Sequence, residues 1–271
     1  MSYVYSDFDT LAVGWLSAGG SPTLAELDAA TTGGSWDFYG APQGFGVIRA
    51  DGSGLGDQAL EIKHDTTAPL FFNNYGARLD FDSGQLVSDL GSDYIEIQFK
   101  SGLKRSTGFT RKGYWFIKDG TTTLVELRLQ DGKLYFNNTN LGNIASHEDA
   151  YTACPWESNH ATVGTSPPYD VVYNFSIKIY GDGSVDVSVI GIHDASNVSG
   201  SKGAGEVSTG ATINRLEYNY YVTTPASPPC TDTQGIYLGY VQVGTPPIPS
   251  TSRLDIPSRV NTLQTSNALW P

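Results

Sequence analysis

Regular alternation of apolar and polar residues recurs along this chain and restricts what it can fold into. In the segment 94–100 (YIEIQFK), apolar side chains alternate with charged or amide ones. The segments 122–130 and 171–180 repeat the pattern. A period of two places successive side chains on opposite faces of a strand, so each segment predicts a strand with one buried face.

Tight turns join these segments. Asp119-Gly120, Asp131-Gly132 and Gly181-Asp182-Gly183 stand between alternating runs, and such Gly-containing turns favour antiparallel hairpins. Further strands are expected at 59–63, 113–118, 133–137, 184–190, 211–221 and 235–243. Because no helix of ordinary length is expected after residue 30, we predict an all-β, two-sheet antiparallel jelly-roll sandwich.

The segments outside these strands are expected to be loops. Residues 1–44 look irregular apart from one short helix, which the capping box of Thr23 and Glu26 predicts ahead of Leu27. Long loops are expected at 138–169 and 194–210.

Two parts of different character follow from this pattern. Residues 1–243 form the predicted sandwich, which is within the size range of a single all-β domain. Residues 244–271 are rich in proline and lack alternation, so they predict an extended C-terminal arm.

Composition excludes several classes of partner. The net charge of −12 argues against nucleic acid, which requires a broad positive face. No apolar run approaches membrane-spanning length. The first residues lack the basic and apolar regions of a signal peptide, so we expect a chain made without secretion, or one supplied after its leader was removed.

Two sets of residues each allow two interpretations: aspartates that could bind calcium, and a pair of cysteines that could form a disulfide. Asp51 and Asp57 bracket a Gly-rich turn that suits calcium or is a plain turn, and Asp7 with Asp9 is a second such candidate. No other cofactor is expected. Cys154 and Cys230 lie in Pro-bearing loops, where they either form a disulfide between two loops or stay as free thiols.

Two sets of side chains are candidates for contact with a partner. Basic residues gather within a short stretch and are expected on one hairpin loop, where they either meet an acidic ligand or neighbouring subunit or are simply solvated: Lys100, Lys104, Arg105, Arg111 and Lys112. Aromatic residues that could stack on sugar rings, or else belong to the core or sheet surface, are Trp156, Tyr218, Tyr220 and Tyr221.

The order of strands resembles the concanavalin A-like lectin/glucanase superfamily in its laminin-G-like branch. The resemblance is carried by LVELRLQDGKLYFNN (124–138), YNFSIKIYGDGSVDVSVIG (173–191) and INRLEYNYY with GIYLGYVQVG (213–221 and 235–244), and by the opening DFDTLAVGWL (7–16). It implies a jelly-roll sandwich, and it leaves function open because the superfamily contains lectins, carbohydrate-binding modules, hydrolases, lyases and structural modules.

Enzymes of that superfamily carry motifs that this chain lacks. The E-x-D-x-x-E strand of laminarinase-like members is absent, and so is the Q-I-H of alginate-lyase-like members. The nearest string to R-[ST]-E-L-R is Val125-Glu126-Leu127-Arg128, without the first arginine. The resemblance therefore implies a protein that is not an enzyme.

Three functions are compatible with these observations. We expect first a structural or assembly subunit of a virion (a bacteriophage capsid decoration, cement or head-fibre protein) on a virion or extracellular particle surface, with neighbouring subunits as partners in a homo-oligomer or capsid. The alternative is a carbohydrate-binding protein that recognises a polysaccharide. A diverged polysaccharide lyase or glycoside hydrolase comes third.

Overall fold

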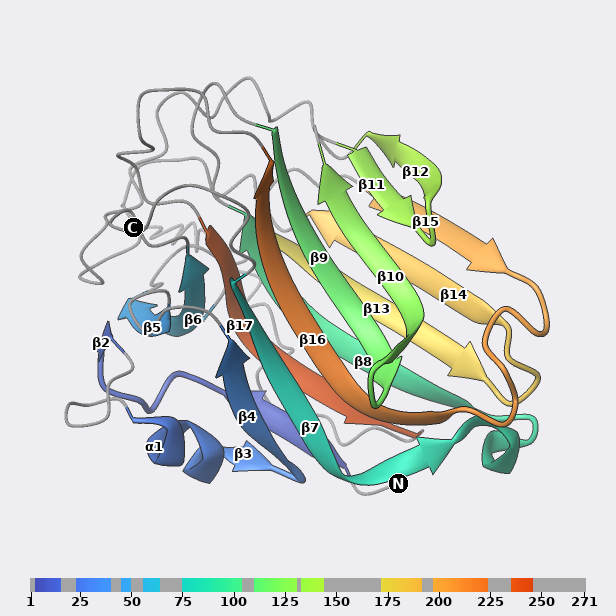
Figure 1. Cartoon of the computed structure of the whole chain (residues 1–271), viewed down its shortest axis with the longest axis horizontal. Coiled ribbons are helices and arrows are strands. Elements are labelled where there is room, and N and C mark those ends of the chain that lie inside the picture. Colours follow the sequence, from blue (N-terminus) through green and yellow to red (C-terminus); the bar gives the residue numbers. More distant parts are fainter. Residues whose placement is uncertain are drawn as a thin grey trace, which may run out of the picture.

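A computed structural model of the chain consists of two antiparallel β-sheets packed face to face (Figure 1). The structure describes residues 3–15, 23–39, 45–49, 56–63, 75–103, 110–130, 133–143, 172–191, 197–223 and 235–245. The predicted all-β sandwich is confirmed, with one short α-helix near the N-terminus.

Seven strands form the sheet that faces the viewer in Figure 1, in the order β12-β11-β10-β9-β16-β7-β4. All neighbouring pairs in this sheet are antiparallel. Its strands are β4 (Gly34–Tyr39), β7 (Tyr75–Leu86), β9 (Thr110–Asp119), β10 (Thr122–Gln130), β11 (Lys133–Phe136), β12 (Thr139–Asn143) and β16 (Thr212–Thr223).

Ten strands form the sheet behind it, in the order β15-β14-β13-β8-β17-β6-β5-β2, with β1 paired to β17 and β3 paired to β1. Its strands are β1 (Val4–Asp7), β2 (Gly14–Trp15), β3 (Thr31–Thr32), β5 (Phe45–Arg49), β6 (Gln58–Lys63), β8 (Tyr94–Leu103), β13 (Val172–Tyr180), β14 (Val185–Gly191), β15 (Asn197–Lys202) and β17 (Gly235–Gly244).

The last strands in the sequence occupy central positions in both sheets. Strand β17 lies between β8 on one side and β6 and β1 on the other, so Val243 near the end of the described chain pairs with Val4 near its start. Strand β16 lies between β9 and β7 in the seven-stranded sheet. Each sheet therefore joins parts of the chain that are far apart in sequence.

The predicted capping box is present at the start of α1 (Leu24–Ala29). The backbone N–H of Glu26 donates to the Thr23 hydroxyl oxygen at 3.2 Å, and the Glu26 carboxylate accepts the Thr23 backbone N–H at 2.6 Å. Leu27 is buried and attaches the helix to the core. A short 3-10 helix covers Val87–Leu90. Within the described ranges, none of the helices has the length and apolar character needed to span a membrane.

The core between the sheets is built from alternate side chains of each strand and centres on stacked aromatic rings. Phe99 and Phe175 stack with ring centroids 4.6 Å apart, and Trp115 lies 4.7 Å from Phe175. Tyr218 meets Phe99 edge to face at 5.6 Å. These rings link strands of both sheets, so the relative position of the sheets is fixed by aromatic packing.

The expectation that residues 1–44 are irregular was wrong. Strands β1 and β4 lie there, as do the two-residue strands β2 and β3. Strand β4 joins the seven-stranded sheet because Trp36 is buried between the sheets and pairs with Leu79 of β7. Such short runs show too few alternations to be recognised alone. Strand β4 is stabilised by pairing with β7, a strand that we did not predict.

The two expected long loops also contain strands. Strand β12 lies within 138–169, and β15 lies within 194–210. Both are end strands of their sheets among the described residues and contact each other, with Lys202 Nζ donating to the Thr139 hydroxyl at 2.9 Å. Strand β17 ends at Gly244, and residues 246–271 of the predicted arm lie outside the described residues. The division at 243/244 therefore remains a prediction.

Candidate functional site

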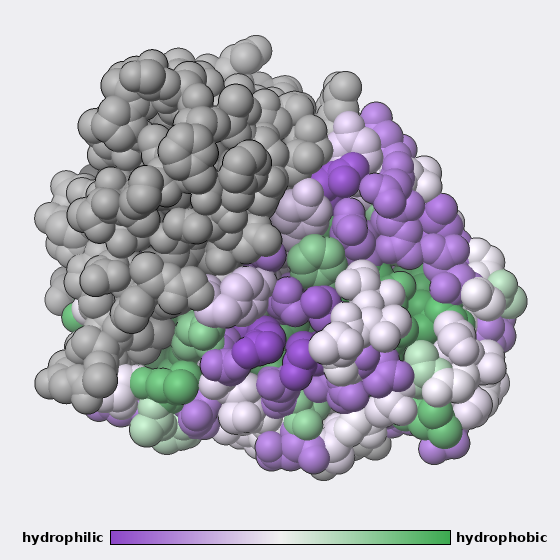
Figure 2. Space-filling view, viewed as in Figure 1, coloured by the Kyte–Doolittle hydropathy of each residue, from purple (hydrophilic) through white to green (hydrophobic). Residues whose placement is uncertain are grey.

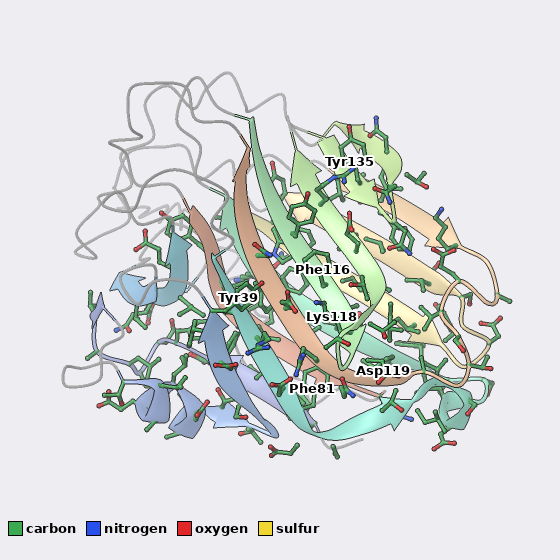
Figure 3. All side chains as sticks on the ribbon, viewed as in Figure 1. Tyr39, Phe81, Phe116, Lys118, Asp119 and Tyr135 are labelled. Carbon is green, nitrogen blue, oxygen red and sulfur yellow. The ribbon has the colours of Figure 1, made fainter. Side chains whose placement is uncertain are left out.

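The outer surface of the seven-stranded sheet combines paired charges with aromatic rings, and we call it the charged aromatic face. Alternation turns every second side chain away from the core. Hydrophilic residues dominate this surface over the described strands (Figure 2). Figure 3 labels four of its residues in place. The face comprises Asp37, Tyr39, Arg78, Asp80, Tyr114, Phe116, Lys118, Glu126, Arg128, Tyr135, Arg215, Glu217 and Asn219.

Strand register arranges these side chains in rows across the sheet. One row begins at Tyr135 on β11, continues through Arg128 and Tyr114, and reaches Asn219 on β16. It ends at Tyr39 on β4, because Gly76 of β7 pairs with both Asn219 and Tyr39. Neighbouring strands lie about 4.8 Å apart, so aromatic rings recur along this row at intervals of roughly 10–15 Å.

Four ion pairs lie on this face, and three of them belong entirely to the rows beside the aromatic one. Lys118 Nζ lies 2.6 Å from Glu217 Oε2 at the centre of the face, where their side chains are only 14% and 12% exposed. Toward the sides, one pair joins Arg128 to Glu126 at 3.6 Å. The remaining two pairs are Arg78 with Asp37 and Arg215 with Asp80.

The ring of Tyr39 passes over Gly76 to reach the central ion pair of Lys118 and Glu217. Its hydroxyl donates to Glu217 Oε1 at 2.9 Å, although Tyr39 is on β4 and Glu217 is two strands away on β16. A Cβ at Gly76 would lie 2.0 Å from Tyr39 Cζ, so only glycine leaves room for the ring. Burial, followed by the negative charge of Glu217, raises the pKa of Tyr39 far above its usual range.

Cationic side chains lie over aromatic rings of this face. The rings of Tyr114 and Phe116 stack with centroids 5.4 Å apart. Lys118 Nζ lies 5.2 Å from the centre of the Phe116 ring, and the Arg128 guanidinium lies 4.6 Å from that of Tyr135. Tyr135 and Phe116 are half-buried, so the rings are held in place without being enclosed.

Four buried polar atoms of the face make no hydrogen bond: Nε of Arg78, Oε1 of Glu126, Nε of Arg128 and Oδ1 of Asn219. Two are donors and two are acceptors. Buried polar atoms normally have a partner, either protein or bound water or ligand. Two of them, in Arg128 and Asn219, belong to the aromatic row itself.

The ionisable groups of this face are engaged with one another. Each carboxylate of the four ion pairs faces a cation. Tyr39 keeps its proton far into the alkaline range and its hydroxyl is already used by Glu217, so it is a poor general base at neutral pH.

Of the two alternatives for Tyr218, the structure shows the core position and not a ring that could stack on a sugar. Its side chain is 1% exposed and lies between Trp36 and Phe99 in the core. It points inward because it shares a strand face with Leu216, which is also buried. Tyr220 and Tyr221 lie in β16, but their side chains are outside the described residues, as is all of Trp156.

The predicted basic hairpin loop was wrong. Lys100 is in β8 of the ten-stranded sheet, whereas Arg111 and Lys112 are in β9 of the seven-stranded sheet. The chain between these strands therefore passes from one sheet to the other. Lys100 Nζ lies 5.8 Å from the centre of the Tyr240 ring, and burial lowers the pKa of Lys100. Lys104 and Arg105 lie outside the described residues.

The candidate calcium ligands serve the backbone where they are described. Asp9 Oδ1 accepts the backbone N–H groups of Asp57 and Gln58 at 2.9 and 2.8 Å, which fixes the chain at the start of β6. The backbone N–H of Asp9 donates to Asp7 Oδ1 at 2.8 Å. Asp51, Cys154 and Cys230 lie outside the described residues, and the described residues hold no group of three or more metal ligands.

Sequence reasoning missed the charged aromatic face as a site. Its signal is present at the outward positions of the strands, which carry arginine, glutamate and aromatic residues, whereas serine recurs at the outward positions of β13 to β15. The strings RLD (78–80), YWFIK (114–118) and RLE (215–217) show this pattern. Only the strand order, which the sequence does not contain, places these strings next to one another.

Several solved structures have a similar arrangement of strands. The alginate lyase from Klebsiella pneumoniae is 10% identical, covering 89% of this chain and 94% of that one with a TM-score of 0.48. A carbohydrate esterase from Shiga toxin-encoding bacteriophage phi24B is 12% identical, with 86% and 98% coverage and a TM-score of 0.42. Lectin I from Ulex europaeus is 9% identical, with 78% and 91% coverage and a TM-score of 0.42.

At these identities the likeness concerns the fold alone. The two antiparallel sheets that pack face to face agree with the jelly-roll sandwich that the sequence resemblance implied. No protein-family model matches the sequence, and no curated protein matches it either.

Proposed function

We propose that this chain is a carbohydrate-binding protein that holds a polysaccharide on the charged aromatic face without cleaving it. The observation that carries the proposal is the row from Tyr135 to Tyr39, in which aromatic rings alternate with polar side chains that have buried, unpaired atoms. Sugars present apolar ring faces and polar hydroxyl edges, and this row offers a partner for each.

The orientation of the row suits a linear polymer. Because it crosses the strands of the sheet, successive sugar units would meet successive strands. Half-buried rings lose little conformational freedom on binding, which preserves affinity. The carboxylates of Glu217 and Glu126 are engaged with Lys118 and Arg128, and this supports binding without hydrolysis.

The test compares matched pairs of a cation and an aromatic ring on the two sheets. Arg128 over Tyr135 on the charged aromatic face and Lys178 over Tyr94 on the other sheet both have the cation 4.6 Å from the ring centre. We expect Tyr135→Ala to weaken binding to immobilised polysaccharides at least about tenfold, the loss of roughly 1.4 kcal/mol of binding free energy. Tyr94→Ala should leave binding unchanged.

The same assay examines catalysis. Incubation of each bound polysaccharide with the protein should release neither reducing ends nor unsaturated products. Binding that is equally weakened by Tyr94→Ala and Tyr135→Ala would reject the charged aromatic face as the site, and product release would reject the non-catalytic assignment.

The assembly role expected from the sequence is the second candidate: a subunit on the surface of a virion, such as a capsid decoration, cement or head-fibre protein. It is supported by Ile190, which is 43% exposed next to the end strand β15. An exposed large apolar side chain beside a strand that ends its sheet among the described residues suits contact with a neighbouring subunit. Sedimentation of the protein and of Ile190→Asp tests this role, and a monomer in both would count against it.

A further inference from the structure

The described cations of the charged aromatic face are each paired with a carboxylate of the same face. Lys118 is paired with Glu217, and Arg215 with Asp80. Arg78 and Arg128 have carboxylate partners as well. The four described pairs therefore contribute no net charge, in a chain whose net charge is −12.

We infer that the charged aromatic face selects uncharged glycans and discriminates against glycans that carry carboxylates; this inference rests on the proposed function. An acidic sugar would need a cation that is free to accept it. To gain Lys118, its carboxylate would have to displace Glu217, which is only 12% exposed and would be left without its counter-ion. The fixed carboxylates would also repel the ligand's charge.

Neutral hydroxyl groups meet no such penalty. A sugar hydroxyl both donates and accepts hydrogen bonds. The face offers a buried acceptor at Asn219 Oδ1 and buried donors at Nε of Arg78 and Arg128. A hydroxyl gains such an atom when the side chain turns toward the ligand. Asn219 is uncharged, so turning its amide outward breaks no ion pair, and the ion pairs of Arg78 and Arg128 use the terminal guanidinium nitrogens and not Nε.

Selectivity can be measured with ligands that differ only in charge. Homopolymers of galacturonic, glucuronic and mannuronic acid are compared with the same polymers after their carboxyl groups are reduced to primary alcohols. We expect at least one reduced polymer to bind about tenfold or more tightly than its acidic parent. Because no charge pairing with the ligand is involved, added salt should not weaken that binding.

A charge variant provides the decisive comparison. Asp80→Asn with Glu217→Gln leaves Arg215 and Lys118 unpaired, and should shift the preference toward the acidic parent by about tenfold or more. The control, Glu96→Gln with Asp186→Asn, removes the same charge from strands β8 and β14 of the other sheet and should not shift it. Near-ultraviolet circular dichroism verifies folding, and Asp80→Asn alone replaces the double variant if Glu217→Gln disrupts it.

The results separate this inference from the function on which it rests. If an acidic parent binds more tightly than its reduced form and Tyr135→Ala abolishes that binding, the face binds glycans but the selectivity argument is wrong. If charge variants on both sheets shift the preference equally, overall charge is responsible and the inference is also wrong. If no polymer binds, or Tyr135→Ala has no effect, the proposed function itself is wrong.

Discussion

Substitution of Gly76 by alanine tests whether the charged aromatic face is held together by the close approach of Tyr39 to β7. The added Cβ would lie 2.0 Å from Cζ and 2.1 Å from the hydroxyl oxygen of Tyr39. Carbon atoms in favourable contact are about 3.5–4.0 Å apart, so the ring has to move by more than about 1.5 Å. The 2.9 Å hydrogen bond from Tyr39 to Glu217 is lost in that movement.

The expected cost follows from the groups that separate. A hydrogen bond to a charged acceptor contributes about 1.5–3 kcal/mol to stability. Replacing glycine by alanine also restricts the unfolded chain, which stabilises the folded state by about 0.4–1 kcal/mol. The two effects oppose each other, so Gly76→Ala should lower the free energy of unfolding by about 0.5–2.6 kcal/mol.

Urea unfolding of the single and double variants at Gly76 and Tyr39 measures whether the Tyr39 ring causes the loss of stability in Gly76→Ala. In a Tyr39→Ala background the clash with the ring is absent, and Gly76→Ala should then be neutral or stabilising. Gly203→Ala is the control, because a Cβ there has no atom within 4 Å. If Gly76→Ala costs the same with and without the Tyr39 ring, the strain resides in the strand itself and the account given for Gly76 is refuted.

Three further predictions concern single side chains. Tyr218→Phe should be neutral or slightly stabilising by urea unfolding, because the Tyr218 hydroxyl is buried without a hydrogen bond. Glycan binding should persist in this variant, and a marked loss of stability or of binding would contradict a core role. Gln242 is 1% exposed with both amide atoms unpaired, so Gln242→Met should raise the free energy of unfolding by about 1–2 kcal/mol, whereas a decrease would reveal a hidden partner. Burial raises the pKa of Tyr39, and that of Tyr240 to about 12. Both raised pKa values lie above the value of about 10 for an unfolded tyrosine, so their stabilisation is complete below about pH 10 and is lost as the pH rises through the folded pKa. The free energy of unfolding should therefore fall above about pH 10, less steeply in Tyr39→Phe, and an unchanged slope would contradict the raised pKa of Tyr39.

The strands with clean alternation were predictable because their burial is periodic. Ile95, Ile97 and Phe99 all point into the core, as expected from segment 94–100. Strands at the ends of sheets bury less and so leave a weaker pattern, which is why β12 and β15 were taken for loops. Strand β7 was missed although it alternates, because glycine and aspartate, which are uncommon in strands, interrupt its apolar residues.

The site was harder to predict than the fold, for two physical reasons. First, Tyr218 was chosen for its type, although the alternation of β16 places it on the same face as Leu216 and therefore inside. Second, the charged aromatic face combines Tyr39, Arg78 and Glu217, which are far apart in sequence. Local patterns reveal which strand face is polar, but only the pairing of strands decides which polar groups meet.

The central position of β17 has a consequence for the order in which the chain can fold. Strands β8, β6 and β1 all pair with β17, so before Gly235–Gly244 is in place the described strands of the ten-stranded sheet are divided into three parts. Contacts between such distant segments close slowly, because the entropy of a long loop is lost before any contact forms. During synthesis, the earlier strands must wait for almost the whole described chain, with edges open to pairing with other chains.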